Sequence, residues 1–249
     1  MNHIRAIGFD LFNTLIFVEP HAIDIAVKKL TESLMEGGVV VEHEPFRSAH
    51  LEAALQFLET ARGNGRETHN RFWISAALET LGFNVPPDDP RISEAVEAYF
   101  SVFLDLSHPI PGTGEMLEAL RGRYALGLLS NYTHASAARK IMDRLGLTRF
   151  FDVVLISGEL GYRKPHPYVF RRLVEQLEVE KDQVLFVGDD PDADIDGALD
   201  AGLQPVWTTY VRDWNMPFAA NALSGADRTP EEKVQRFSTW EEFFSLLEA

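Results

Sequence analysis

Residues 4–15 read IRAIGFDLFNTL, and the rest of the chain is best understood from this stretch. A mostly apolar run reaches Phe9 and is followed at once by Asp10. A short apolar run of this kind is typical of a strand buried on both faces of a parallel sheet. In such sheets, ligands bind just beyond the carboxyl ends of the strands. The stretch therefore predicts a strand over residues 4–10 that presents a carboxylate to a binding crevice.

The composition is that of an ordinary globular protein and excludes several classes of function. The 249 residues include 23 Lys and Arg against 38 Asp and Glu, a net charge of −15 that argues against nucleic acid as a partner. Without cysteine the chain has no disulfide framework and no thiolate metal site. It has neither a signal-peptide pattern nor the ~18 consecutive apolar residues of a membrane span. We expect a cytoplasmic protein with no membrane or nucleic-acid partner, and the sequence gives no indication of its oligomeric state.

The next ninety or so residues have the apolar period of helices and no strand pattern. We expect four helices: from Pro20 to Gly37, over about 44–61, from Thr68 to Gly82, and from about Pro90 onward. The second should bury Leu51, Ala54, Leu55 and Leu58. The aromatic residues of this segment are expected in its core, with a substrate pocket as the alternative; they are Phe72, Trp73, Tyr99 and Phe103.

From residue 108 onward the pattern changes to strands that alternate with helices. Strands are predicted over 124–129, 152–156, 184–187, 203–207 and 234–237, and helices over 113–121, 134–145, 167–177 and 193–201. A last helix should begin at Thr239, with Glu242 completing a capping box, and 211–232 should be a loop. The alternation predicts an α/β fold with a doubly wound parallel sheet. We expect this core to comprise residues 1–17 and 108–249, with an all-helical unit, 18–107, inserted after the first strand.

Polar residues stand where the predicted strands end. Asp10 follows the first strand, Ser130 and Asn131 follow the second, and Asp189 follows the fourth. The loop after the third strand carries Lys164. Because these strand ends lie along one edge of a parallel sheet, we expect the side chains to converge on one crevice.

The segment GDDPDADIDG, residues 188–197, places five aspartates within eight positions. Carboxylates this close repel one another unless a cation neutralises them. A calcium loop beginning at Asp192 is excluded because its twelfth position is Leu203, where a bidentate Glu is required. Magnesium held by one or two carboxylates and a substrate phosphate fits the segment better.

The order of these signals resembles that of the haloacid dehalogenase superfamily of hydrolases. The matching segments are FDLFNTL (9–15), LLSN (128–131), GYRKPHPYVF (161–170) and VGDDPDADIDGALDAG (187–202). The helical insert also resembles the class-one cap of that superfamily. The resemblance implies a Rossmann-like core and hydrolysis of a small phosphorylated metabolite through an aspartyl-phosphate intermediate.

Catalytic roles follow from the resemblance, residue by residue. It implies that Asp10 is the nucleophile and that Ser130, Asn131 and Lys164 bind the transferred phosphoryl group, with Lys164 neutralising the charge that develops. A carboxylate nucleophile divides the hydrolysis into two easier steps. The rest of phosphoryl transfer requires mainly positioning and charge neutralisation.

The resemblance also implies a magnesium site. Asp10 and Asp189 would bind the ion directly, together with the backbone carbonyl of Phe12. Asp190 or Asp194 would act through water.

Phe12 departs from the phosphatase pattern. Phosphatases of the superfamily usually carry a second Asp here, which protonates the leaving group and then activates water. A phenyl ring can do neither, and the loss should cost ~10²–10⁴-fold in rate for a poor leaving group. If another residue supplies the proton, Glu19 and His21, just past this motif, are the first candidates.

Three functions therefore remain open. One is a magnesium-dependent phosphatase, weak or selective for good leaving groups. Another is a 2-haloacid dehalogenase, since those enzymes carry an aromatic residue at the position of Phe12, although they need no magnesium and lack the aspartates of the fourth motif. The third is a non-catalytic descendant that binds a phosphorylated ligand or a protein.

Overall fold

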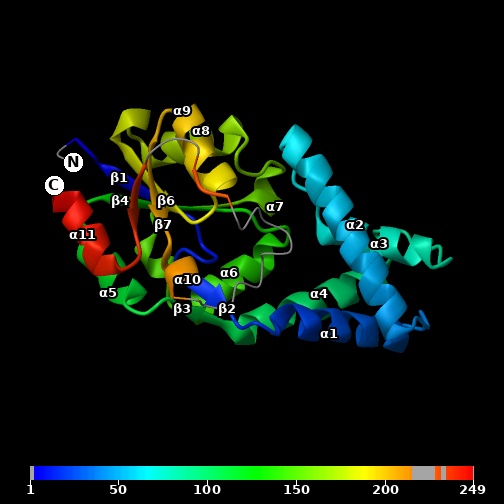
Figure 1. Cartoon of the computed structure of the whole chain (residues 1–249). Coiled ribbons are helices and arrows are strands. Elements are labelled where there is room, and N and C mark those ends of the chain that lie inside the picture. Colours follow the sequence, from blue (N-terminus) through cyan, green and yellow to red (C-terminus); the bar gives the residue numbers. More distant parts are fainter. Residues whose placement is uncertain (1–2, 215–227, 231–233, 249) are drawn as a thin grey trace.

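The computed structural model describes residues 3–214, 228–230 and 234–248, and its centre is a parallel sheet (Figure 1). Six strands lie in the order β5-β4-β1-β6-β7-β8, and every neighbouring pair is parallel. They are β1 (Ala6–Phe9), β4 (Ala125–Ser130), β5 (Val153–Ile156), β6 (Val184–Gly188), β7 (Gln204–Thr208) and β8 (Gln235–Phe237). The expected doubly wound α/β sheet is confirmed, with strand ends within one or two residues of the predicted ones.

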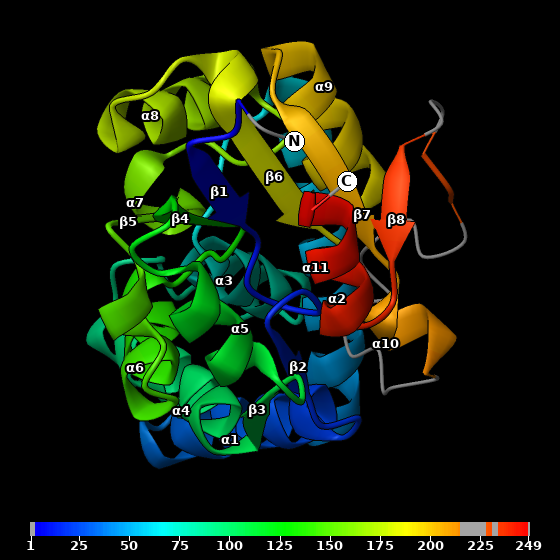
Figure 2. The same cartoon turned by 90° about the vertical axis from the view of Figure 1, so that its left-hand side faces the viewer.

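Helices cover both faces of this sheet (Figure 2). They are α5 (Thr113–Leu120), α6 (Ala135–Arg144), α7 (Ser157–Leu160), α8 (Pro167–Leu177), α9 (Gly197–Ala201), α10 (Tyr210–Asp213) and α11 (Trp240–Glu248). Side chains alternate along β1, so that Ile7 and Phe9 belong to one apolar core and Ala6 to the other. Gly8 is required on the second face, because a Cβ there would lie 2.8 Å from the ring of Phe186.

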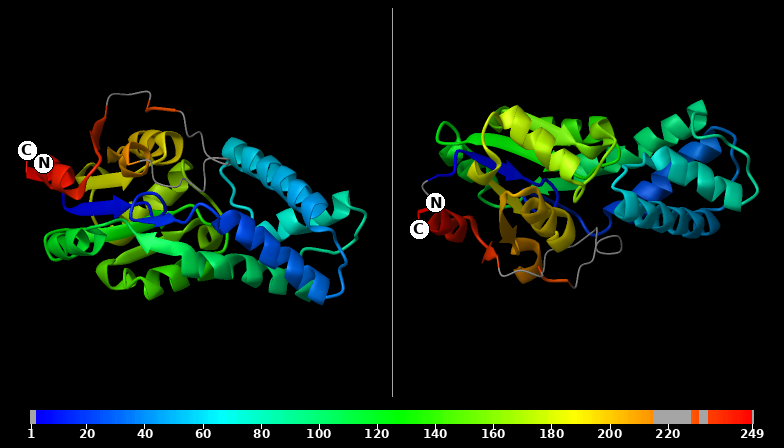
Figure 3. Two further views of the ribbon diagram at one scale, coloured as in Figure 1. Left: turned by 60° about the horizontal axis from the view of Figure 1, so that its bottom comes forward. Right: turned by 90° about the horizontal axis from the view of Figure 1, so that it is seen from above.

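Four helices form an insert between β1 and β4, which we call the helical insert: α1 (Ala22–Glu36), α2 (His43–Asn64), α3 (Asn70–Thr80) and α4 (Pro90–Leu106). Figure 3 shows the insert at one end of the molecule and both chain termini at the opposite end. The four predicted helices are present. On α2 the predicted burial of Ala54 and Leu58 is confirmed, but it was wrong for Leu51 and Leu55, which are each 44% exposed; Phe46, Ala49 and Ala53 are buried as well. Small alanines, rather than the larger leucines, allow α2 to lie close to its neighbours.

The start of α3 also differs from the prediction. His69, not Thr68, is the N-cap, and its ring accepts a hydrogen bond from the backbone N–H of Arg71. The N-cap of α4 is Asp89, whose side chain accepts a hydrogen bond from the backbone N–H of Arg91. Pro90, between them, is the first residue of the helix.

Two short strands join the helical insert to the sheet. β2 (Ile16–Val18) and β3 (Ser107–Pro109) pair antiparallel. The expectation of an insert without strands was therefore wrong at Val18 and Ser107. Three-residue strands, one of them Ser-His-Pro, are too short to show an alternating pattern.

The last part of the sheet brings two further corrections. The helix expected over 193–201 begins instead as a π-helical turn, Pro191–Asp196, and continues as α9. The loop expected over 211–232 starts within α10, and its residues 215–227 and 231–233 lie outside the described residues. Half of the predicted capping box of α11 forms: Thr239 Oγ1 accepts from the N–H of Glu242, but the carboxylate of Glu242 accepts from the N–H of Ser238 rather than of Thr239. Within the described part of the chain, no helix is long and apolar enough to cross a membrane.

Candidate active site

The sheet order brings the predicted polar residues together. β1 lies between β4 and β6, so Asp10, Ser130 and Asp189 stand side by side at the carboxyl ends of three neighbouring strands. All three side chains are buried, at 7%, 1% and 7% exposure. They line one cavity of about 460 Å³, as the sequence predicted for a single crevice.

Lys164 lies between two of the carboxylates. Its Nζ is 2.7 Å from Oδ1 of Asp10 and 2.6 Å from Oδ1 of Asp194, and all three side chains are at least 90% buried. Burial alone would lower the pKa of Lys164, but the charges of Asp10 and Asp194 outweigh it and raise that pKa above its ordinary value. The lysine is therefore fully charged at neutral pH.

Asn131 fixes the backbone that carries Lys164. Its side chain accepts the N–H of Lys164 at 2.8 Å and donates to the carbonyl of Lys164 at 3.0 Å. The amide is thus occupied by the loop. Asn131 therefore positions Lys164. The sequence had predicted only a role in substrate binding for Asn131.

Three buried carboxylates are crowded at one point. One oxygen each of Asp10, Asp189 and Asp194 lies within 4.8 Å of the others. Burial, and next the charges of Asp194 and Asp10, raise the pKa of Asp189 well above its ordinary value. Burial, opposed by Lys164, raises that of Asp194 to about 7. One lysine cannot neutralise three carboxylates, so the set of oxygen donors fits a hard divalent cation such as magnesium.

The π-helical turn explains why Asp194 and Asp190 differ. The backbone carbonyl of Asp190 accepts from the N–H of both Asp194 and Ile195. This widened turn directs Asp194 back to Lys164 and to the N–H of Asp190, which its Oδ2 accepts at 3.0 Å. Oδ1 of Asp190 instead accepts from the N–H groups of Asp192 and Ala193. Asp190 is therefore outside the crowded set, and Asp194 is inside it.

Phe12 is built into an aromatic wall. Its ring stacks on Tyr132, with centroids 4.8 Å apart and planes 11° apart. Tyr132 in turn meets Phe100 of α4 at 5.3 Å. The position that carries an acid in related phosphatases thus belongs to a stack that runs from the sheet into the helical insert.

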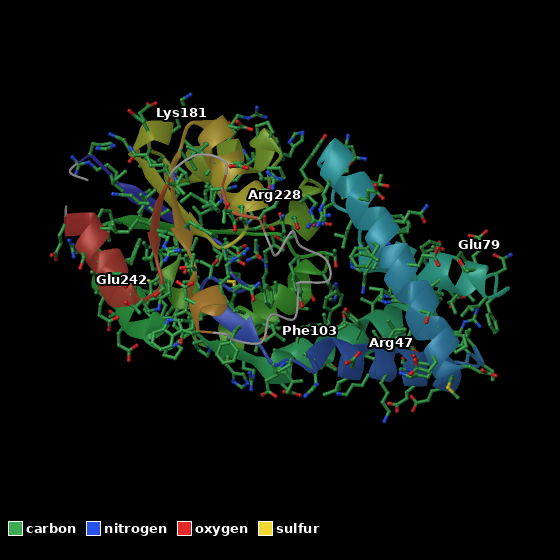
Figure 4. All side chains as sticks on the ribbon, viewed as in Figure 1. Arg47, Glu79, Phe103, Lys181, Arg228 and Glu242 are labelled. Atoms are coloured by element: carbon green, nitrogen blue, oxygen red, sulfur yellow. The ribbon has the colours of Figure 1, made fainter. Side chains whose placement is uncertain are left out.

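The helical insert forms the other side of the cavity. Trp73, Tyr99 and Phe103 line it together with Phe100 and Asn70. Figure 4 labels Phe103, which lies where the insert meets the α/β part. The expectation that these aromatic residues only fill the core of the insert was thus incomplete, because three of the four face the cavity, whereas Phe72 is 36% exposed.

The two alternative acids predicted near the first motif are not at the site. Glu19 pairs with His108 at 2.8 Å on the surface, and His21 is exposed. The insert does bring one carboxylate, Glu67, to the cavity. Its oxygens accept from Ser157 Oγ at 2.5 Å and from the N–H of Thr68, so it holds the insert against the start of α7. Neither Glu67 nor Asn70 had a sequence signal, since each lies near a helix start that could be read only as surface.

The insert also carries four arginines whose charges could contact an anionic substrate or simply be solvated: Arg47, Arg62, Arg66 and Arg71. Arg47 forms an exposed pair with Asp24 at 3.1 Å, and Arg66 lies over the ring of Tyr162. Arg62 lines the cavity.

Similarity to known proteins agrees with the geometry. The glyceraldehyde 3-phosphate phosphatase of Pyrococcus abyssi is 28% identical over 83% of this chain and 82% of its own length. The ribulose-1,5-bisphosphate 5-phosphatase of Halopiger xanaduensis is 29% identical over 92% of both chains. Among solved structures, a 2-haloacid dehalogenase from Pseudomonas syringae pv. Tomato matches with a TM-score of 0.72 at 24% identity over 98% of both chains. The family profile of haloacid dehalogenase-like hydrolases matches residues 4–202. The chain is therefore an enzyme that belongs to the haloacid dehalogenase-like hydrolases.

Proposed function

We propose that this hydrolase is a magnesium-dependent phosphatase that acts through an aspartyl phosphate on Asp10. The observation that carries the proposal is the crowding of Asp10, Asp189 and Asp194 around a single lysine. A site that displaces halide at carbon has no use for three buried carboxylates, whereas a phosphoryl-transfer site needs a divalent cation. The sequence relatives that are named as phosphatases support the same reading.

The chemistry at Asp10 follows from its surroundings. Its carboxylate attacks phosphorus, the P–O bond to the leaving group breaks, and water later hydrolyses the aspartyl phosphate. Lys164 offsets the charge that builds up on the phosphoryl oxygens, and Ser130 donates a hydrogen bond to one of them. Magnesium would be held by Asp10, Asp189 and the backbone carbonyl of Phe12, and it would supply further charge neutralisation. Asp190 or Asp194 would contact the ion through water.

The helical insert serves as the cap in this proposal. Residues 18–107 close over the sheet edge and exclude bulk water from the reacting atoms, while residues 1–17 and 108–249 carry the chemistry. Glu67 and Ser157 tie the two together at 2.5 Å. The substrate would be a small phosphorylated metabolite in the cytoplasm.

Phe12 limits which substrates react well. No proton donor stands at this position, so leaving groups that depart as stable anions are favoured, such as acyl and aryl phosphates. The same absence slows the attack of water on the aspartyl phosphate.

Dehalogenation is the second candidate, on one observation. The stack of Phe12 on Tyr132 makes an apolar wall beside Asp10, suited to a substrate that loses halide without a proton. Magnesium dependence separates the two, because the carboxylate set serves only the phosphatase.

The test is turnover of acyl and aryl phosphates and of 2-haloacids, with magnesium and with EDTA, by the parent protein and Asp10→Asn. We expect phosphate release that needs magnesium and falls on the order of 10⁴-fold or more in the variant. Halide release in EDTA would establish the dehalogenase instead. Ligand binding without turnover, unchanged in Asp10→Asn, would establish the non-catalytic alternative.

A further inference from the structure

The insert side of the cavity holds polar atoms with no partner. Both amide atoms of Asn70, the indole Nε1 of Trp73 and the hydroxyl of Tyr132 are buried and make no hydrogen bond to any described residue. All three residues line the cavity. Such buried orphans are rare in native proteins, and each costs roughly 1–3 kcal/mol. Four such atoms, on three residues that line one cavity, point to a ligand that supplies the missing partners.

The three groups come from two different parts of the cavity lining. Asn70 and Trp73 are three residues apart in α3, which places them on the same face of that helix. Tyr132 lies in the loop after β4, held between the rings of Phe12 and Phe100. Its hydroxyl stays protonated, because burial raises the pKa of Tyr132 well above its ordinary value.

Most of the side chains that the insert contributes around these groups are apolar. Strand β2 contributes Val18 to the lining, and the insert contributes Ile23, Leu58, Tyr99 and Phe103. The only cavity-lining carboxylate that α2, α3 and the loop between them contribute in the described structure is Glu67, whose oxygens are already occupied by Ser157 and Thr68. A ligand here meets aromatic and aliphatic faces, a few neutral donors and acceptors, and the guanidinium group of Arg62.

We infer that the organic part of the substrate is a flat, largely apolar group that ends in a neutral unit with both a donor and an acceptor, such as a carboxamide or lactam edge. An amide side chain pairs with such an edge through two hydrogen bonds, and Asn70 offers one donor and one acceptor for it. The indole N–H and the tyrosine hydroxyl bind the acceptor from the sides. The inference rests on the proposed phosphatase function and names the substrate class of the same site.

This cavity is a poor match for polyol phosphates. A sugar chain carries a hydroxyl on nearly every carbon, and most of these would face Val18, Leu58 or an aromatic ring without a partner. The substrates named for the relatives, glyceraldehyde 3-phosphate and ribulose 1,5-bisphosphate, are of this polar kind. The insert of this chain thus selects a different organic group for the same chemistry.

The experiment measures binding rather than turnover, so that leaving-group reactivity plays no part. Benzylphosphonate, 4-carbamoylbenzylphosphonate and 3,4-dihydroxybutylphosphonate are titrated into the parent protein with magnesium by calorimetry. We expect the carbamoyl compound to bind about tenfold more tightly than benzylphosphonate, and the dihydroxybutyl compound to bind more weakly than both. Asn70→Leu should abolish the carbamoyl preference and leave the affinity for benzylphosphonate within about twofold.

Two further variants make the result specific. Asn84→Leu is the same chemical change at an exposed asparagine outside the cavity, and it should keep the preference. Trp73→Phe removes the indole N–H while keeping an aromatic ring, although a smaller one, and should lower the preference by a factor of about three, so that the test stands even if Asn70→Leu fails to fold. Equal binding of the two aromatic phosphonates by the parent would overturn the inference, and so would an unchanged preference in both Asn70→Leu and Trp73→Phe. If phosphonate binding still depends on magnesium in that case, the proposed phosphatase function stands. No phosphonate binding at all would contradict both.

Discussion

The two sides of the cavity differ in what holds their polar groups. On the sheet side, Lys164 contacts Asp10 and Asp194 at 2.7 and 2.6 Å, and Asn131 fixes its backbone. On the insert side, Asn70 and Trp73 carry polar atoms with no partner among the described residues. The side chains on the sheet side are thus held in place for the chemical reaction. The insert side is incomplete without a ligand, which is what a surface that selects substrates requires.

The largest expected effect lies where the two sides meet. Phe12→Asp should raise turnover of alkyl phosphate monoesters by ~10²–10⁴-fold, because it supplies an acid and base near Asp10. The negative charge of Asp10 raises the pKa of such a carboxyl and Lys164 lowers it, so we expect the gain in the lower part of that range. Initial rates on a panel of alkyl phosphates measure the effect.

Phe12→Leu is the control, since it also removes the stack on Tyr132 but adds no carboxylate. Both variants need a melting curve first, because losing a packed aromatic ring costs roughly 3–5 kcal/mol when fully buried. An equal change of rate in Phe12→Leu would show that the ring, and not the missing acid, limits the parent.

The next effect concerns the leaving group. Without an acid at position 12, log rate should fall steeply as the pKa of the leaving group rises across a series of substituted phenyl phosphates, and the slope should flatten in Phe12→Asp. A flat dependence in the parent would mean that another group donates the proton. Glu67 would then be the first to replace, since it is the carboxylate that the insert brings to the cavity.

The sheet side was readable from sequence and the insert side was not. Asp10, Ser130 and Asp189 each end an apolar strand, and parallel pairing alone makes such ends converge. Asn70 and Tyr132 reach the cavity only because of how α3 and the loop after β4 pack. The pattern of apolar residues along the sequence does not predict that packing. Half of the buried face of α2 was misjudged for a related reason: Ala49 and Ala53 are buried, where Leu51 and Leu55 were expected.

A third prediction concerns magnesium and pH on the sheet side. Saturating magnesium, at about 100 times its Kd, should stabilise the parent by roughly 2.7 kcal/mol and leave Asp189→Asn little changed. Without metal the folded-state pKa values of Asp189 and Asp194 lie above their unfolded values. The parent should therefore lose stability as pH rises from about 4 through 7, and Asp189→Asn should lose less. Urea unfolding in EDTA and in magnesium measures both; an identical magnesium response in the two proteins would show that the site is misassigned.

The insert should show the opposite dependence on pH, and this is the smallest effect. His50 of α2 is 5% exposed between Phe46 and Tyr99, and burial lowers its pKa from 6.5 to about 4. Between about pH 4 and pH 6.5, His50 is therefore protonated in the unfolded chain and neutral in the folded one. From pH 7 to pH 5 the parent should lose about 2 kcal/mol more than His50→Leu. Equal losses would place His50 in contact with water.

The central claim is a covalent phosphoryl group on Asp10, and it can be observed directly. Because Phe12 cannot activate water, the aspartyl phosphate should decay slowly and accumulate during turnover of p-nitrophenyl phosphate. Acid quenching followed by peptide mass spectrometry should find one phosphoryl group on the peptide that contains Asp10, only when magnesium is present and never in Asp10→Asn. Steady turnover with no phosphoryl group on that peptide, or undiminished turnover by Asp10→Asn, would contradict the account.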